Sequence, residues 1–207
     1  MTTAPTTEWH LRDGKARVFL APGRRGIQRP VILVGDAGTD LDTLTTSLED
    51  GSYALLAELH ASGRDLVLVG LTADGALGGQ GETVQEVIMR TIGERVGSVP
   101  LAVGGTGRGA LVTRYALARS ENQAVDLQTS VHFSHNGTAP AGEAEVDLLD
   151  RMGNWPMRPL KLGLIGGGAT SEIDVEAFDD SKSDSTDPGS ALLSKELGTW
   201  LLERLPS

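Results

Sequence analysis

Residues 100–117, Pro-Leu-Ala-Val-Gly-Gly-Thr-Gly-Arg-Gly-Ala-Leu-Val-Thr-Arg-Tyr-Ala-Leu, decide the fold of this chain. Residues 100–104 form a short apolar run, which is typical of a strand buried on both faces of a sheet. Glycines follow at once, and a helix is expected over residues 110–119. A strand, a sharp glycine turn and a helix in direct succession indicate an α/β protein with a parallel sheet.

The rest of the chain repeats this alternation on both sides of that stretch. Residues 9–20 alternate loosely and predict an edge hairpin, and further strands are predicted over residues 30–35, 65–70, 125–134 and 160–165. Helices are predicted over residues 44–60, 83–96 and 191–205, where apolar residues recur at 3- and 4-residue steps. We therefore expect one α/β domain over residues 1–207, with a mostly parallel sheet and helices on both faces. The polar residues 179–189 predict a flexible loop.

Composition narrows the classes of function. The 207 residues carry a net charge of −10, which argues against nucleic acid or an anionic membrane as a partner. There is no cysteine, so disulfides and thiolate chemistry are excluded. The first residues have neither a basic nor an apolar segment of a secretory signal, and no apolar run is long enough to span a bilayer. A cytoplasmic location is the expectation.

The turn itself is Gly105-Thr106-Gly107-Arg108-Gly109, here called the elbow. It resembles the nucleophile elbow of lipase- and esterase-type α/β-hydrolases, in which a G-x-S-x-G turn joins a strand to a helix. The helix portion matches without a gap at Leu111, Val112, Arg114, Tyr115, Ala116 and Leu117. In this register the nucleophile position falls on Gly107, which has no oxygen with which to attack.

The resemblance covers residues 29–117 and, more weakly, residues 153–168. It implies an α/β-hydrolase-like fold with little or no lid, and a loop at Asp36 and Ala37 that supplies an oxyanion-hole amide. The acid of the triad should follow the late strand, where Glu172 or Asp174 stands. The histidine should come later still, but residues 166–207 contain none. The resemblance thus implies the scaffold of a hydrolase without its serine and late histidine.

The glycines of the elbow allow three other interpretations, each of which the neighbouring residues fit less well. A shift by one residue would make Thr106 the nucleophile, but it would put Arg108 in a tight turn and break the helix match. A P-loop is not satisfied because no Lys-Ser or Lys-Thr pair follows, and the G-x-G-x-G spacing does not fit a dinucleotide-binding turn.

Candidate site residues lie in loops at the carboxyl ends of the strands, where α/β sheets build their sites. Asp36 is a candidate catalytic carboxylate or, alternatively, a cap of the next turn. His135 is a candidate acid or base or, alternatively, a solvated loop histidine. Arg108 is a candidate anchor for an anionic substrate or, alternatively, faces solvent. Ala37, Gly107 and Arg108 are the candidate substrate-binding residues, through backbone amides that can bind a carbonyl oxygen.

Three functions remain open from the sequence. The first is a non-hydrolytic enzyme (a lyase, isomerase or cyclase, as in natural-product biosynthesis) that polarises the carbonyl of a small molecule in the oxyanion pocket. Its candidate acids or bases are Asp36, His135 and Glu172. The second is a catalytically inactive binding or scaffold protein. The third is an atypical hydrolase that uses Thr106. No metal and no cofactor is expected, and the sequence does not specify the oligomeric state.

Overall fold

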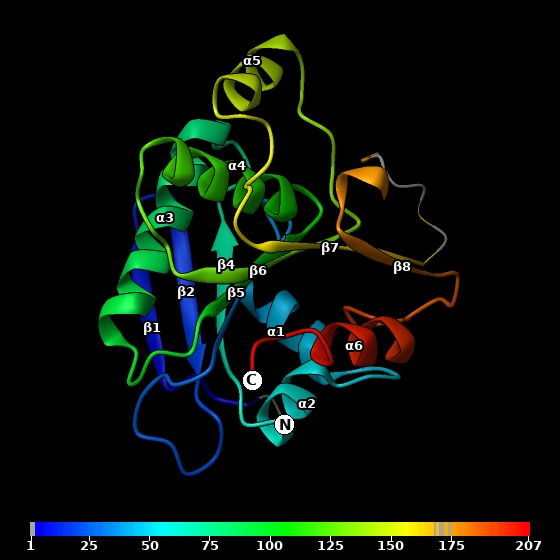
Figure 1. Cartoon of the computed structure of the whole chain (residues 1–207). Coiled ribbons are helices and arrows are strands. Elements are labelled where there is room, and N and C mark those ends of the chain that lie inside the picture. Colours follow the sequence, from blue (N-terminus) through cyan, green and yellow to red (C-terminus); the bar gives the residue numbers. More distant parts are fainter. Residues whose placement is uncertain (1–2, 168, 170–171, 174) are drawn as a thin grey trace.

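The computed structural model describes residues 3–167, 169, 172–173 and 175–207 (Figure 1). One eight-stranded sheet runs through the molecule in the order β1-β2-β4-β3-β5-β6-β7-β8. The strands are β1 (Thr7–Leu11), β2 (Gly14–Phe19), β3 (Pro30–Val34), β4 (Asp65–Leu71), β5 (Leu101–Thr106), β6 (Thr129–His135), β7 (Leu160–Gly166) and β8 (Asp180–Asp184). The helices are α1 (Leu41–Glu49), α2 (Leu55–Ala61), α3 (Leu77–Glu94), α4 (Arg108–Asn122), α5 (Glu143–Arg151), the 3₁₀ turn η1 (Val175–Ala177) and α6 (Lys195–Leu202).

The sheet is mostly parallel, as the sequence predicts. Strand β2 pairs antiparallel with β1 and with β4, and every pairing from β4 to β8 is parallel. The carboxyl ends of β3, β5 and β6 therefore lie side by side at one edge of the sheet. The loops that follow these three strands carry the candidate site residues.

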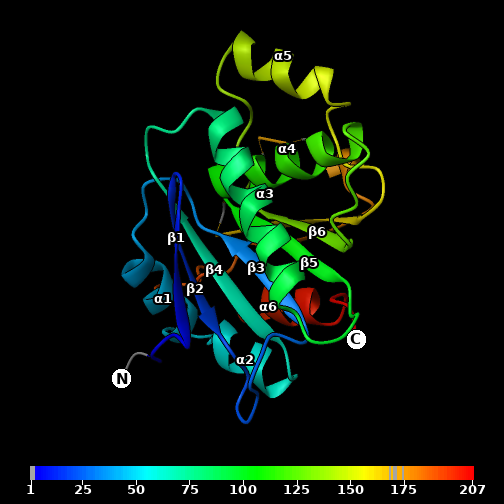
Figure 2. The ribbon, with the colours of Figure 1, turned by 90° about the vertical axis from the view of Figure 1, so that its left-hand side faces the viewer.

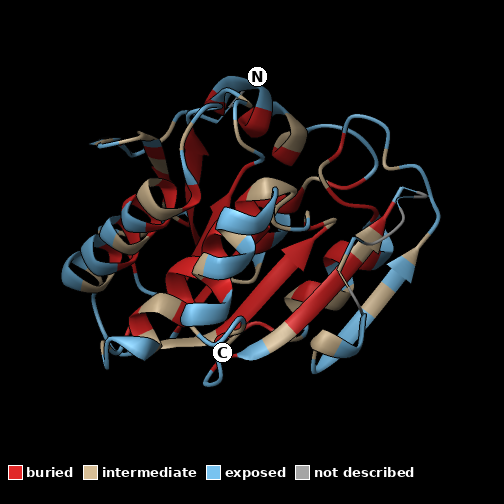
Figure 3. Ribbon diagram, turned by 90° about the horizontal axis from the view of Figure 1, so that it is seen from above, coloured by how far each residue is buried: buried red, intermediate tan, exposed pale blue. Residues whose placement is uncertain are grey.

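Helices cover both faces of the sheet (Figures 1 and 2). On one face α3 and α4 pack through a core that includes Ile88 and Leu111, and on the other α1, α2 and α6 pack through a core that includes Leu48, Leu59 and Leu197. Every residue of β3 and β4 is buried, which explains why both strands are continuous apolar runs (Figure 3). No helix in the described part of the chain is long and apolar enough to cross a membrane.

The helix predicted over residues 44–60 is wrong as a single element, because it is two helices, α1 and α2. Gly51 lies between them with a φ of +80°, and a Cβ at this position would lie 2.7 Å from the backbone nitrogen of Ala191. The apolar periodicity continues across the break, so it did not reveal this turn. Helix α3 begins at Leu77, earlier than predicted, because Gly81 packs directly against the ring of Tyr115.

Residues 180–184 form the edge strand β8, where a flexible loop was predicted. The strand has no apolar pattern because its stability comes from backbone pairing with β7 and from α6. Three of its side chains pair with α6 or with residues next to it: Asp180 with Arg204, Lys182 with Glu196, and Asp184 with Ser194.

Helix α5 was not predicted. It lies in the connection between β6 and β7 and stands beyond α4 at one end of the molecule (Figures 1 and 2). Leu149 is its one buried residue and the helix has only 9 residues, so the sequence holds a shorter apolar pattern than the window from which helices are predicted.

Candidate functional site

Gly107 forms the sharp turn of the elbow, between the last residue of β5 and the first residue of α4. Its φ of +53° and ψ of −126° lie in a region that glycine tolerates and L side chains avoid. A Cβ at Gly105 would lie 2.7 Å from the nitrogen of Ala110, and one at Gly109 would lie 2.4 Å from the carbonyl oxygen of Gly35. The strained position is therefore Gly107 and not Thr106, in the register that the helix match predicts.

The Asp36 carboxylate occupies the inside of this turn. Its Oδ1 accepts hydrogen bonds from the backbone N–H of Arg108 at 2.8 Å and of Ala37 at 3.1 Å. A Cβ built on Gly107 would lie 2.6 Å from the same oxygen. Asp36 thus reaches the place where a side chain at position 107 would begin. It caps the amino end of α4, whereas the following helix, α1, is capped by Asp40.

The three amides expected to bind a substrate carbonyl all have partners within the chain. Those of Ala37 and Arg108 donate to Asp36, and that of Gly107 donates to the carbonyl of His135 at 3.0 Å. In this structure a ligand carbonyl would therefore have to replace these partners to reach the amides. For Ala37 and Arg108 the partner is a carboxylate, which is a strong acceptor for N–H groups.

The Arg108 side chain is neither solvent-facing nor free. Its guanidinium donates to both carboxylate oxygens of Glu145 on α5, at 3.0 and 2.5 Å, and to Gln80 Oε1 on α3 at 3.3 Å. The side chains of Arg108 and Glu145 are 20% and 14% exposed. The hydrogen bonds with Glu145 raise the pKa of Arg108 and lower that of Glu145, in each case against the effect of burial.

His135 is the last residue of β6 and is buried, so it is not a solvated loop histidine. Its Nδ1 lies 3.4 Å from Thr106 Oγ1, which is long for a hydrogen bond of this kind. Burial lowers the pKa of His135 to about 4, so the ring is neutral at neutral pH. The ring borders a small apolar cavity of about 10 Å³, whose walls include Phe133, Leu164 and Leu201.

Of the candidate acids after β7, the described Glu172 does not pair with His135. Glu172 accepts a hydrogen bond from the backbone N–H of Ala139 at 2.9 Å, in the loop that follows β6. Asp174 lies outside the described residues. The structure thus joins Asp36, Ala37, Gly107 and Arg108 in one cluster and sets Thr106 beside His135.

Two residues of the site were missed by sequence reasoning. Gln80 is fully buried in α3, and Glu145 lies in α5, which was not predicted. A buried glutamine at an apolar position is a detectable signal only after the helix has been placed. The partnership of Glu145 with Arg108, 37 residues apart, has no signal in spacing.

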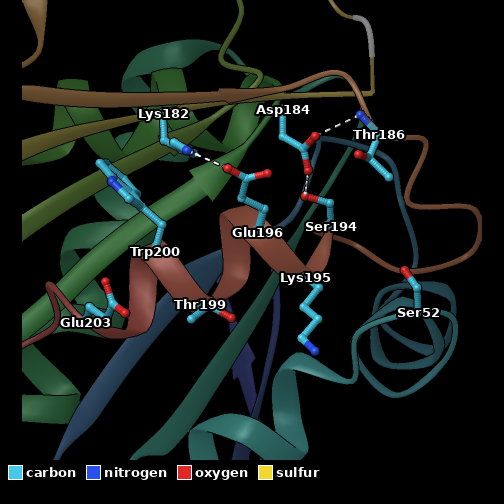
Figure 4. Close-up of a pocket in the computed structure, with 10 residues that line it drawn as sticks. All are labelled: Ser52, Lys182, Asp184, Thr186, Ser194, Lys195, Glu196, Thr199, Trp200 and Glu203. Atoms are coloured by element: carbon cyan, nitrogen blue, oxygen red, sulfur yellow. Dashed lines mark hydrogen bonds and ion pairs between the residues drawn. The ribbon is translucent and has the colours of Figure 1, made fainter.

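A metal site and a surface hollow are two further kinds of candidate site. Among the described residues, no group of three or more His, Asp and Glu side chains could hold a metal ion. A hollow of about 610 Å³ lies between β8, α6 and the loop at Ser52 (Figure 4). Lys182 and Glu196 in its lining pair with each other, and it contains none of the predicted site residues.

The chain matches no protein-family model and no curated protein. It is similar in structure to an esterase from Pyrobaculum calidifontis (TM-score 0.65, 10% identity, covering 96% of this chain and 84% of that one). It is also similar to a putative esterase from Staphylococcus aureus (TM-score 0.64, 12% identity, 99% and 84% covered). A third similar structure is an α/β serine hydrolase without a lid from Xanthomonas campestris (TM-score 0.53, 16% identity, 87% and 84% covered). At these identities the likeness concerns the fold, and the chain has an α/β-hydrolase-like fold whose structural neighbours include esterases.

Proposed function

We propose that this protein is a non-hydrolytic enzyme for a small carbonyl compound, in which the Asp36 carboxylate is the reactive group. One observation carries the proposal. Asp36 Oδ1 is held by two backbone amides at the place where the side chain of an elbow nucleophile would begin. Asp36 is exposed, and its Oδ2 has no hydrogen-bond donor among the described residues.

The chemistry that suits this arrangement is general base catalysis. Oδ2 takes a proton from the carbon next to a carbonyl, and the electron pair of the broken C–H bond moves to the carbonyl oxygen as an enolate. Return of the proton to another carbon completes an isomerisation, and expulsion of a leaving group from the next carbon completes an elimination. In this proposal the two amides orient the base instead of polarising the substrate.

A positive charge beside the carboxylate supports the same step. The hydrogen bond to Glu145 is the main cause of the raised pKa of Arg108, and electrostatic attraction by Asp36 adds to it. A fixed charge of this kind stabilises negative charge that develops on a reacting carbonyl oxygen. The lack of a side chain at Gly107 leaves the space for Asp36.

The proposal is tested by proton exchange, which needs no knowledge of the natural substrate. Protein in D₂O is mixed with a panel of small ketones, keto acids and thioesters, and loss of the proton next to the carbonyl is followed by NMR. The wild type should accelerate exchange for at least one class. Asp36→Asn keeps an oxygen for the two amides but removes the base, and it should lower the rate by about 100-fold or more.

A catalytically silent binding or scaffold protein is the second candidate, and one observation favours it. The polar groups of the elbow already have partners within the chain. Asp36 accepts two backbone N–H groups, and Glu145 pairs with the Arg108 side chain. Exchange rates equal to buffer for the wild type and for Asp36→Asn, across the whole panel, would favour this candidate over the enzyme.

A further inference from the structure

We propose that Arg108 is the binding site for a carboxylate group of the ligand, and that Glu145 fills this site as an internal substitute. The Arg108–Glu145 pair has the geometry of ligand recognition. Two guanidinium nitrogens face the two oxygens of one carboxylate, which is the fork that arginine uses for planar anions. Gln80 Oε1 accepts from Nε of the same guanidinium and fixes its plane.

The arginine is held in place independently of Glu145. Its backbone N–H is fixed on Asp36, and it is the first residue of α4, the helix that packs against β5. Gln80 is itself fixed, because its Nε2 donates to the carbonyl of Thr72 at 2.9 Å. The Arg108 guanidinium would therefore keep its position if Glu145 moved away from it.

The glutamate is held by a lightly anchored helix. Leu149 is the one buried residue of α5, and the helix has no side-chain cap. Apart from Arg108, the Glu145 carboxylate accepts only the backbone N–H of Ala141, at the start of the same segment. Moving α5 would free the guanidinium, and it would break the ion pair and the packing of Leu148 and Leu149 against the core.

This inference rests on the proposed function for its meaning, because a carboxylate bound to Arg108 would lie beside Asp36. It specifies the substrate class: a small carbonyl compound that also carries a carboxylate. The size of the effect follows from competition. A tethered glutamate competes as an effective concentration in the millimolar range, and its removal strengthens binding by one plus the ratio of that concentration to its dissociation constant. The gain should be about twofold or more when both are millimolar.

The test is an NMR titration of ¹⁵N-labelled protein with sodium propionate at constant ionic strength, following the arginine Nε–H signals. Glu145→Gln should bind propionate at least about twofold more tightly than the wild type. Glu143→Gln is the matched control, since it removes the same charge from an exposed position on the same helix turn. Adding Arg108→Gln to Glu145→Gln should abolish binding.

Three results would overturn the inference: equal affinity in Glu145→Gln and Glu143→Gln, binding that survives Arg108→Gln, or inorganic phosphate binding more tightly than propionate. Hydrogen exchange on the wild type gives a second measurement that depends on no variant. Saturating propionate should increase amide exchange in α5, and unchanged exchange there would count against the displacement of Glu145. Binding is read without turnover, so this inference and the proton-transfer proposal can fail separately.

Discussion

Replacing Gly107 with serine would restore the hydrolase-type residue at the elbow, and the structure predicts that it destabilises the protein. Two costs add. A φ of +53° with a ψ of −126° costs a non-glycine residue about 1–3 kcal/mol. The new Cβ would lie 2.6 Å from Asp36 Oδ1, so the carboxylate must leave its two amides. Asp36 is exposed and water can replace it, so this displacement costs about 1–2 kcal/mol.

The sum is about 3 kcal/mol, which corresponds to a fall of about 6–12 °C in Tm for a domain of this size. The two costs are separated by a double-mutant cycle with Asp36→Ala, measured by urea unfolding. With the carboxylate gone, Gly107→Ser should cost about 1–2 kcal/mol less, and Gly107→Ala should behave in the same way. Costs that add within about 0.5 kcal/mol in both backgrounds would refute the claim that Asp36 fills this space.

The same variant should not become an efficient esterase. A serine needs a base to take its proton, and the nearby His135 is buried beside Thr106. Rapid turnover of a p-nitrophenyl ester by Gly107→Ser would mean that a base already faces position 107, and it would contradict this account of the site.

Three other predictions follow from the geometry. The wild type should show no stoichiometric labelling by a fluorophosphonate and no turnover of p-nitrophenyl esters, whereas labelling that disappears in Thr106→Val would revive the hydrolase interpretation. Burial lowers the pKa of His135 to about 4, below its value in the unfolded chain, so its contribution to stability is present above about pH 6.5 and is lost as the pH falls toward 4. In His135→Gln the free energy of unfolding, measured in urea, should fall less over that pH range. An equal fall in the variant and the wild type would contradict the lowered pKa of His135. The fully buried Asp65 accepts the amides of Ala21, Gln28 and Arg29 and pairs with Arg24, so Asp65→Ala should lower the unfolding free energy by about 3–5 kcal/mol, and a loss below about 1 kcal/mol would show that water replaces the carboxylate.

Local patterns in the sequence predict most of the fold. The runs at residues 30–35 and 65–70 are close to β3 and β4, because a strand buried on both faces is mostly apolar, and the run at residues 160–165 is close to the partly buried β7. The turn residue could be placed from the sequence for a similar reason. Only glycine fits the contacts at Gly105 and Gly109, and the helix that follows sets the register.

Elements that are stabilised mainly by their partners were not predictable in this way. Strand β8 is polar because α6 pairs with its side chains, and α5 has one buried residue. The break between α1 and α2 depends on a contact of Gly51 with residue 191, far along the chain.

The sequence by itself determined the α/β class, the register of the elbow and the absence of an attacking oxygen at Gly107, since each depends on residues that are close together in the chain. Only the tertiary structure decided what surrounds that glycine. Asp36 reaches the amide of Arg108 from 72 residues away, and Glu145 reaches the guanidinium of the same residue from 37 residues away. Both contacts depend on which strands are neighbours and where the connection after β6 folds back. A hydrogen bond between distant segments leaves no periodic trace in the sequence, because it requires only one suitable side chain at each end.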